Sequence, residues 1–125
     1  MTDQEYSADV LRLFAATPGA GAPAGPGWLR GEAREPLSAT RVEVFLRVEG
    51  SRVADCRYRV RGCPHTVAAL ATVAARLRGQ ALAGLAFDPR ALAAELEVPP
   101  EKLGRLFVIQ DAIRAAALQL VTADP

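Results

Sequence analysis

The chain has 125 residues, of which half are hydrophobic and 23% are charged, and its formal net charge at pH 7 is +1. This balance is typical of a soluble globular protein with a single hydrophobic core. It excludes a strong overall field that would attract nucleic acid or an anionic membrane. No stretch approaches the roughly 18 consecutive apolar residues of a membrane span. We therefore expect one domain over residues 1–125, with neither nucleic acid nor membrane as a partner.

The N-terminus and the cysteines indicate the compartment. Residues 1–5 are polar and acidic, unlike a secretory signal. Cys56 and Cys63 are seven residues apart, which in an extended chain separates them by roughly 23 Å. A disulfide requires Cα atoms within roughly 7 Å, so both cysteines are expected to be free thiols. Free thiols are typical of a reducing compartment, and we expect a cytoplasmic protein.

The first half of the chain predicts a helix, a loop and three strands. Residues 6–16 have the spacing of a short amphipathic helix, with Ser7 as its N-cap. Residues 18–27 consist almost entirely of Gly, Ala and Pro, which predicts a flexible loop. The predicted strands cover residues 28–35, 41–48 and 52–61, and the first is expected at an edge of the sheet.

Apolar and charged side chains alternate along the second and third strands, as in a hairpin with one buried and one solvated face. Five arginines fall on the solvated face, namely Arg41, Arg47, Arg57, Arg59 and Arg61. Such a set can bind RNA or an acidic partner surface. However, Glu43 shares the face, and no row of aromatic residues for base stacking accompanies the arginines. We interpret this face as solvated, with arginine stems covering Phe45.

The junction after the third strand is the strongest candidate for chemistry. Gly62 permits a sharp turn, and Pro64 suits the first position of a helix. Cys63 therefore lies at or beside the N-cap, where the positive end of the helix dipole favours its thiolate. His65, two residues further on, is placed to reach the thiol or a shared ligand. A structural cysteine and a functional thiol remain equal alternatives at this position.

The remaining residues predict helices at residues 65–78, 81–87, 88–97 and 101–121. Asp88 and Pro89 start the third of these, and Pro99 and Pro100 break the chain before the fourth. The order α-β-β-β-α-α-α-α predicts an α+β fold in which helices cover one face of a three-stranded antiparallel β-meander.

No catalytic triad can be drawn from the polar residues near the element ends, which are Ser38, Thr40, Gln110 and Asp111. The chain has a single histidine, and no paired acid accompanies a nucleophile. We expect no enzymatic activity.

With these elements assigned, the chain resembles the IscU/NifU N-terminal family of iron–sulfur cluster assembly scaffolds. The matching stretches are Tyr-Ser-Ala-Asp-Val at residues 6–10, Gly62-Cys63, Leu-Glu-Val-Pro-Pro-Glu-Lys at 96–102 and Asp-Ala-Ile-Arg-Ala-Ala at 111–116. Together and in this order they are specific. The fold that the resemblance implies is the α+β meander described above.

The resemblance implies a degenerate ligand set. Members of the family hold the nascent cluster with three cysteines, a histidine and an aspartate, and these positions fall on Ser38, Thr40, Cys63, Gly104 and Arg105. Cys63 is the one thiolate retained, with Ser38 or His65 as further candidate ligands. Arg105 replaces the usual sulfur acceptor. The resemblance implies iron or an iron–sulfur cluster as cofactor. Such clusters are normally held by four thiolates, so we expect that this chain does not hold one alone.

Val98-Pro99-Pro100-Glu101-Lys102 corresponds to the family segment that docks a specialised Hsp70-type chaperone. Here Glu101 replaces an apolar residue of that segment. From the residues alone, the same stretch is a break between two helices. The partners that the resemblance implies are a cysteine desulfurase, another scaffold subunit or this chaperone.

The expected function is therefore that of a scaffold-like protein in iron–sulfur cluster assembly that acts by binding partners. One alternative is a relay protein that carries sulfur as a persulfide on Cys63, aided by His65. Another is a structural or regulatory module without chemistry.

Overall fold

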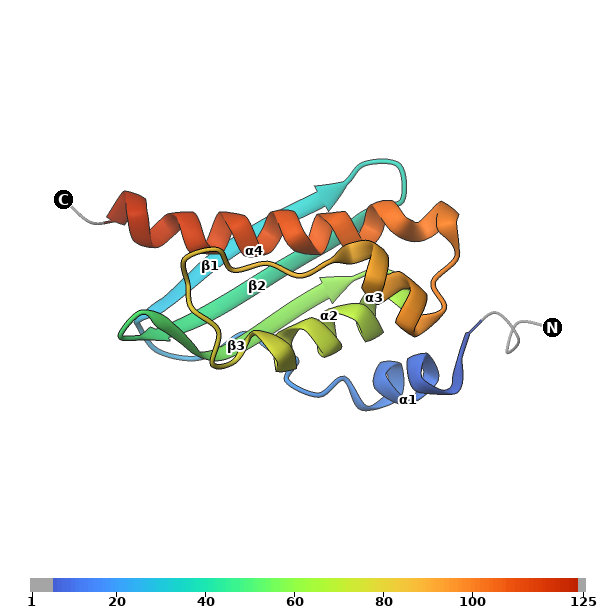
Figure 1. Ribbon diagram of the computed structural model, residues 1–125, viewed down its shortest axis with the longest axis horizontal. Helices are drawn as coiled ribbons and strands as arrows, with labels where there is room; N and C mark the ends of the chain where they lie inside the picture. Colours follow the sequence, from blue (N-terminus) through green and yellow to red (C-terminus); the bar gives the residue numbers. More distant parts are fainter. Residues whose placement is uncertain (1–5, 124–125) are drawn as a thin grey trace.

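The computed structural model describes residues 6–123, with side chains over residues 6–119. Residues 1–5, which include the acidic N-terminus, lie outside the described part. Three antiparallel strands form one sheet in the order β1 (Trp28–Glu35), β2 (Thr40–Glu49) and β3 (Arg52–Arg61). The helical elements are α1 (Ala8–Ala16), α2 (Pro64–Leu77), α3 (Pro89–Leu96), a 3₁₀ turn η2 (Pro100–Lys102) and α4 (Leu103–Ala123). The predicted α+β fold class is confirmed (Figure 1).

Local signals set most element boundaries. Both β1 and β3 have the predicted bounds, and β2 is longer by one residue at each end. Ser7 caps α1 as predicted, because its Oγ accepts a hydrogen bond from the amide of Val10 at 3.2 Å. Asp88 likewise caps α3 by accepting from the amides of Arg90 and Ala91. No helix within residues 6–123 has the length and apolar character needed to cross a membrane.

The helix predicted at residues 81–87 is wrong. Its first residues lie along the start of β3, where the amide of Val53 donates to Gln80 and the amide of Leu82 donates to Ser51, and residues 83–84 form a turn. Pairing with β3 satisfies these backbone groups, and Gly84 takes a positive φ of 75° that breaks a helix. The last α-helix begins two residues later than predicted, after η2. With that turn counted, four helical segments follow the sheet in the described residues.

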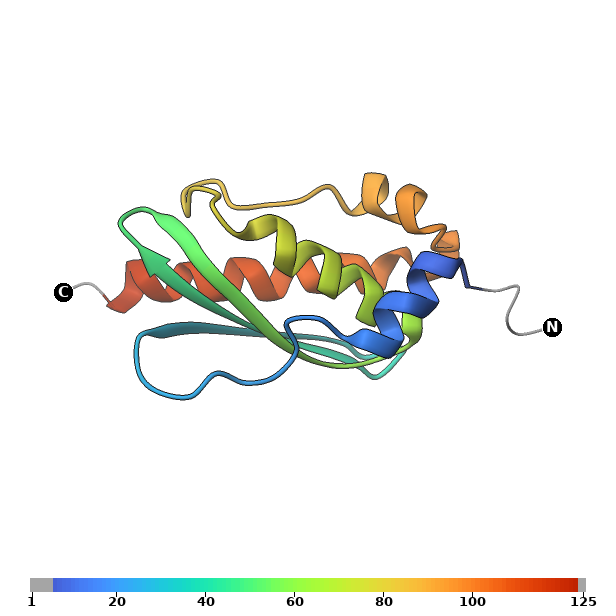
Figure 2. The ribbon, with the colours of Figure 1, turned by 90° about the horizontal axis from the view of Figure 1, so that it is seen from below.

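Helices α2 and α4 pack on the same face of the sheet and bury the core between them (Figures 1 and 2). α4 contacts β1 and β2, α2 contacts β3, and α1 packs beside α2. Gly31 of β1 lies directly against the backbone of α4 at Ala112 and Ala116, where any side chain would overlap with the helix. The absence of a Cβ at residue 31 therefore allows the closest approach of sheet and helix.

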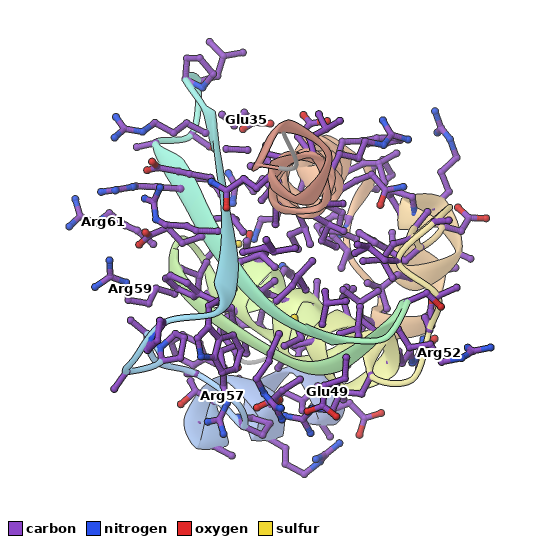
Figure 3. The ribbon with its side chains drawn as sticks, turned by 90° about the vertical axis from the view of Figure 1, so that its left-hand side faces the viewer. Glu35, Glu49, Arg52, Arg57, Arg59 and Arg61 are labelled. Carbon is purple, nitrogen blue, oxygen red and sulfur yellow. The ribbon has the colours of Figure 1, made fainter. Side chains whose placement is uncertain are left out.

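The outer face of the sheet is only partly solvated. Arg59 and Arg61 point away from the helices, as expected (Figure 3). However, Glu43 and Phe45 on the same face are only 5% and 8% exposed. Glu43 is buried because Arg30 and Arg59 form ion pairs with it from both neighbouring strands.

The loop at residues 18–27 is attached at its first half to β3. The hydroxyl of Tyr58 donates to the carbonyl of Pro18 at 2.7 Å, and the amide of Gly21 donates to the carbonyl of Tyr58 at 2.8 Å. The flexibility of this loop stays a prediction.

Candidate functional site

One end of the molecule brings together all five positions of the implied ligand set. Strands β1 and β3 end there, and β2, α2 and α4 begin there, at the right of Figure 1. Cross-element contacts connect these ends, since Glu35 of β1 pairs with Thr40 of β2 and its carboxylate reaches Gly104 of α4. The positions gathered at this end are Ser38, Thr40, Cys63, Gly104 and Arg105.

Cys63 is the N-cap residue of α2, as predicted, with Pro64 in the first turn. Its Sγ lies 3.4 Å from the hydroxyl of the fully buried Thr66. Partial burial by itself raises the pKa of the Cys63 thiol. Hydrogen bonds with the side chain and backbone of Thr66 and with Arg105, together with the charge of Lys102, outweigh that effect. The pKa of this thiol is therefore below its ordinary value, and the thiolate is favoured.

Arg105 and Glu35 place charges at this end. The Arg105 guanidinium is near enough to the Cys63 thiol to lower its pKa. The Glu35 carboxylate lies over Gly104, and a Cβ at residue 104 would be 2.5 Å from its Oε2. Sequence reasoning missed Glu35 and Thr66. Thr66 could have been found, because a residue three positions after an N-cap lies within reach of it.

Ser38 and Thr40 are bonded to each other. Their hydroxyl oxygens are 2.7 Å apart, and Thr40 is almost fully buried. Ala39 between them has a positive φ of 58°, which turns the chain tightly from β1 into β2. Among the described hydrogen bonds, neither hydroxyl is joined to Cys63.

His65 contacts Lys102 and Tyr6. Its ring is fully buried, with Nδ1 3.1 Å from Nζ of Lys102 and its centroid 4.7 Å from that of Tyr6. Two residues along a helix are about 200° apart around its axis, so the N-cap and the second helical position cannot face the same side. This helix geometry disfavours a ligand shared by His65 and Cys63, and the shared ligand stays a prediction.

The segment from Val98 to Lys102 is only partly available to a partner. Val98 is buried, and its amide donates to the carbonyl of Ala93. Lys102, the one lysine of the sequence, turns inward to His65 and lies 5.2 Å above the Tyr6 ring. Pro100 and Glu101 are the exposed members of the segment. The backbone of η2 therefore presents these two residues to solvent.

The acidic, histidine and cysteine side chains are spread over the described residues. Within the part of the chain that the structure describes, no three or more of them are grouped to hold a metal ion. The other cysteine, Cys56, is buried in the core as expected, and burial raises the pKa of its thiol to about 12. The pKa is thus raised for the Cys56 thiol and lowered for the Cys63 thiol.

Comparisons with known proteins identify the relatives of this chain. Residues 5–122 match the family model of the NifU-like N terminal domain. The fold is similar to a protein described as an iron–sulfur cluster assembly scaffold for the SUF system of the thermophile Fervidobacterium islandicum AW-1. That likeness has a TM-score of 0.74 and 12% identity over 94% of this chain and 99% of the other.

A second solved structure with a similar fold is the N-terminal part of a nitrogen-fixing NifU-like protein from Brucella abortus, with a TM-score of 0.70 and 16% identity over 99% of both chains. No curated protein matches the sequence. The solved structures support the fold, and the family model covers nearly the whole sequence. The chain therefore belongs to the NifU-like N-terminal domain family, the scaffold family that its sequence motifs resemble.

Proposed function

We propose that this protein takes part in iron–sulfur cluster assembly as a scaffold-family domain that binds partner proteins and does not hold a conventional cluster alone. Membership of the NifU-like N-terminal family supports the first part of the proposal. The chemistry around Cys63 supports the second.

The position of Arg105 near Cys63 carries the proposal, because its guanidinium lowers the pKa of the Cys63 thiol. A cluster is normally held by four thiolates, and Cys63 provides one. The guanidinium places a permanent positive charge beside this sulfur, where a cationic iron would have to bind. The Glu35 carboxylate fills the space next to Gly104. These residues do not fit a cluster as cargo of a single chain.

The proposed partners are a cysteine desulfurase, another scaffold subunit or an Hsp70-type chaperone, within the cytoplasm. A chaperone contact through the Val98–Lys102 stretch would depend on Pro100 and Glu101, because Lys102 is turned inward. Glu101 is charged, which disfavours an apolar groove. We therefore rank the chaperone below the other two partners.

Anaerobic reconstitution tests the proposal. The protein is mixed with ferrous iron, cysteine and a desulfurase, and visible absorption is recorded. The wild-type monomer should give no stable cluster band. The double variant Ser38→Cys/Arg105→Cys, which together with Cys63 has three thiols at the gathered positions, should give a stable cluster band. A stable band from the wild-type monomer would overturn the proposal.

A second candidate function, sulfur relay, is favoured by the lowered pKa of the Cys63 thiol. The Cys63 thiolate would attack the outer sulfur of a desulfurase persulfide. A sulfur–sulfur bond then forms on Cys63, the bond to the desulfurase sulfur breaks, and the enzyme leaves as a thiolate. Arg105 would stabilise the resulting persulfide anion.

Mass spectrometry after incubation with a desulfurase and cysteine tests this relay. One added sulfur atom should appear on the wild-type chain and be absent from Cys63→Ser. Cys56 is an internal control, because burial and a pKa of about 12 keep it as an unreactive thiol. A wild-type chain without added sulfur would exclude the relay.

A further inference from the structure

Three arginines form a row across one end of the sheet. The strand register places Arg34 of β1 opposite Arg41 of β2, and Arg41 opposite Arg61 of β3. Like charges directly opposite each other on neighbouring strands are destabilising. The fold therefore tolerates a repulsive arrangement at this end, next to the turn that carries Ser38.

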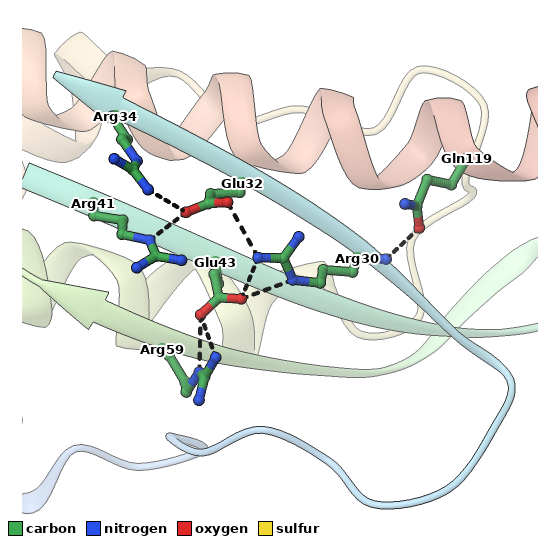
Figure 4. A network of polar contacts seen from close by, with 7 residues as sticks. All are labelled: Arg30, Glu32, Arg34, Arg41, Glu43, Arg59 and Gln119. Carbon is green, nitrogen blue, oxygen red and sulfur yellow. Dashed lines mark hydrogen bonds and ion pairs between the residues drawn. The ribbon is translucent and has the colours of Figure 1, made fainter.

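The neighbouring acids neutralise this row only in part. Glu32 contacts Arg41 and lies 3.6 Å from Arg34, but it also pairs with Arg30 (Figure 4). Arg61 is exposed and forms no ion pair with any residue that the structure describes.

Of the other two glutamates nearby, Glu43 is engaged elsewhere, and Glu35 lines the same hollow as the row but also has a contact on the helix side. Glu43 pairs with Arg30 and Arg59, at 2.6 and 2.7 Å (Figure 4). Glu35 leans over Gly104, on the α4 side of the sheet (Figure 3). The row of Arg34, Arg41 and Arg61 therefore keeps an excess of positive charge.

The shape of this surface suits a protein chain. The three arginines line an open hollow of about 300 Å³, and the rest of its lining is Glu35, Pro36, Ala39 and Thr40. Beside it, Leu37 is 98% exposed at the tip of the β1–β2 turn. A surface with spread guanidinium groups and an isolated apolar side chain is suited to carboxylates interleaved with apolar residues. Arginine binds carboxylates through paired hydrogen bonds, which a planar fork makes specific.

We propose that Arg34, Arg41 and Arg61, with Leu37, form a docking surface for a carboxylate-rich segment of a partner protein. The inference rests on the proposed function only in assigning this surface to partner binding. Nucleic acid fits less well, since Glu32 and Glu43 share the face, and Phe45, an aromatic residue on this face, is buried and so cannot stack with bases. The surface lies at the same end of the molecule as Cys63.

NMR titration of the full-length ¹⁵N-labelled protein tests the surface. The probe is a short synthetic peptide in which glutamates alternate with leucine and serine, and its control replaces each glutamate by glutamine. At low ionic strength the glutamate peptide should shift the amide signals of Arg34, Leu37 and Arg61, and added salt should weaken the effect. The glutamine peptide should leave these signals unchanged. Absence of shifts at this end, or equal shifts with both peptides, would refute the proposal.

Matched variants separate a specific surface from general charge attraction. The double variant Arg34→Gln/Arg61→Gln should weaken binding of the glutamate peptide by about 2- to 30-fold, as expected for the loss of two exposed ion pairs. Arg114→Gln removes an exposed charge on α4 and should leave the affinity unchanged. Equal weakening by Arg114→Gln would overturn the inference, as would tighter binding of a single-stranded oligonucleotide of equal charge.

This titration contains no iron, sulfide or desulfurase. A wild-type chain that assembled a cluster would refute the proposed function and leave the peptide result unaffected. Conversely, failure of the peptide to bind would leave the reconstitution result intact.

Discussion

Arg105, in the first turn of α4, lies near the thiol of Cys63 at the N-cap of α2 and lowers its pKa. These two residues are far apart in sequence, and each occupies a position at which the resemblance implies a cysteine. Their proximity replaces what would be a pair of sulfur ligands by a thiolate and its counter-ion.

The first prediction concerns the reactivity of Cys63. Arg105→Gln removes a positive group that favours the thiolate, so the pKa of the thiol should rise from its lowered value. The pH dependence of alkylation by iodoacetamide, followed by mass spectrometry, should move to higher pH. Arg114→Gln should leave the profile unchanged, and an unchanged profile for Arg105→Gln would show that the guanidinium does not act on the sulfur.

The second prediction concerns acid sensitivity. Burial raises the pKa of Glu43, but hydrogen bonds and ion pairs with Arg30 and Arg59 outweigh it, so the folded-state pKa lies below the unfolded one. The stabilisation is therefore complete above the unfolded pKa of about 4.3 and is lost as the pH falls through the folded pKa.

Glu43→Gln should accordingly lower the free energy of unfolding at pH 7 by about 1–3 kcal/mol. The difference from wild type should shrink below the folded pKa, because the wild-type carboxyl is then protonated. Urea unfolding at pH 7 and at acid pH measures the difference in free energy of unfolding between the variant and wild type under each condition. Glu49→Gln, which breaks an exposed pair with Arg47, should cost less than about 1 kcal/mol. Equal costs for the two variants would mean that burial of Glu43 is energetically unimportant.

The third prediction concerns the contact of sheet and helix. Gly31→Ala places a methyl group against the backbone of Ala112 and Ala116, which cannot move without shifting α4. Overpacking of this kind should cost about 3 kcal/mol or more. Gly104→Ala meets only the end of the flexible Glu35 side chain and gains helix propensity of about 1 kcal/mol, so its stability should stay close to wild type. Thermal unfolding compares the pair, and equal losses would contradict the prediction.

The fourth prediction concerns Lys102. Its ammonium group lies 5.2 Å above the Tyr6 ring and 3.1 Å from His65, and thereby connects η2 to the residues before α1. Lys102→Met keeps the stem but loses the cation–π contact, worth about 0.5–2 kcal/mol. Amide hydrogen exchange of Val10 in α1 should become faster. Arg12→Met, in an exposed pair with Asp9, serves as the control and should have little effect.

The sequence by itself determined the strands, the caps and the position of Cys63. Alternation in β2 and β3, Ser7 and Asp88 as N-caps, and Pro64 after Cys63 are local signals, and each depends on backbone geometry within a few residues. The family motifs were likewise contained in short stretches. For this reason the fold class was predictable.

Only the tertiary structure decided which side chains meet. Residues 81 and 82 pair with the start of β3, and residues 81–87 form no helix, because long-range hydrogen bonds outweighed a weak helical pattern. Arg105 lies near Cys63, Glu35 covers Gly104, and His65 turns to Lys102, because these arrangements depend on how α4 and η2 pack against the sheet and α2. The row of Arg34, Arg41 and Arg61 likewise follows from strand register, which pairs residues that no local sequence signal connects.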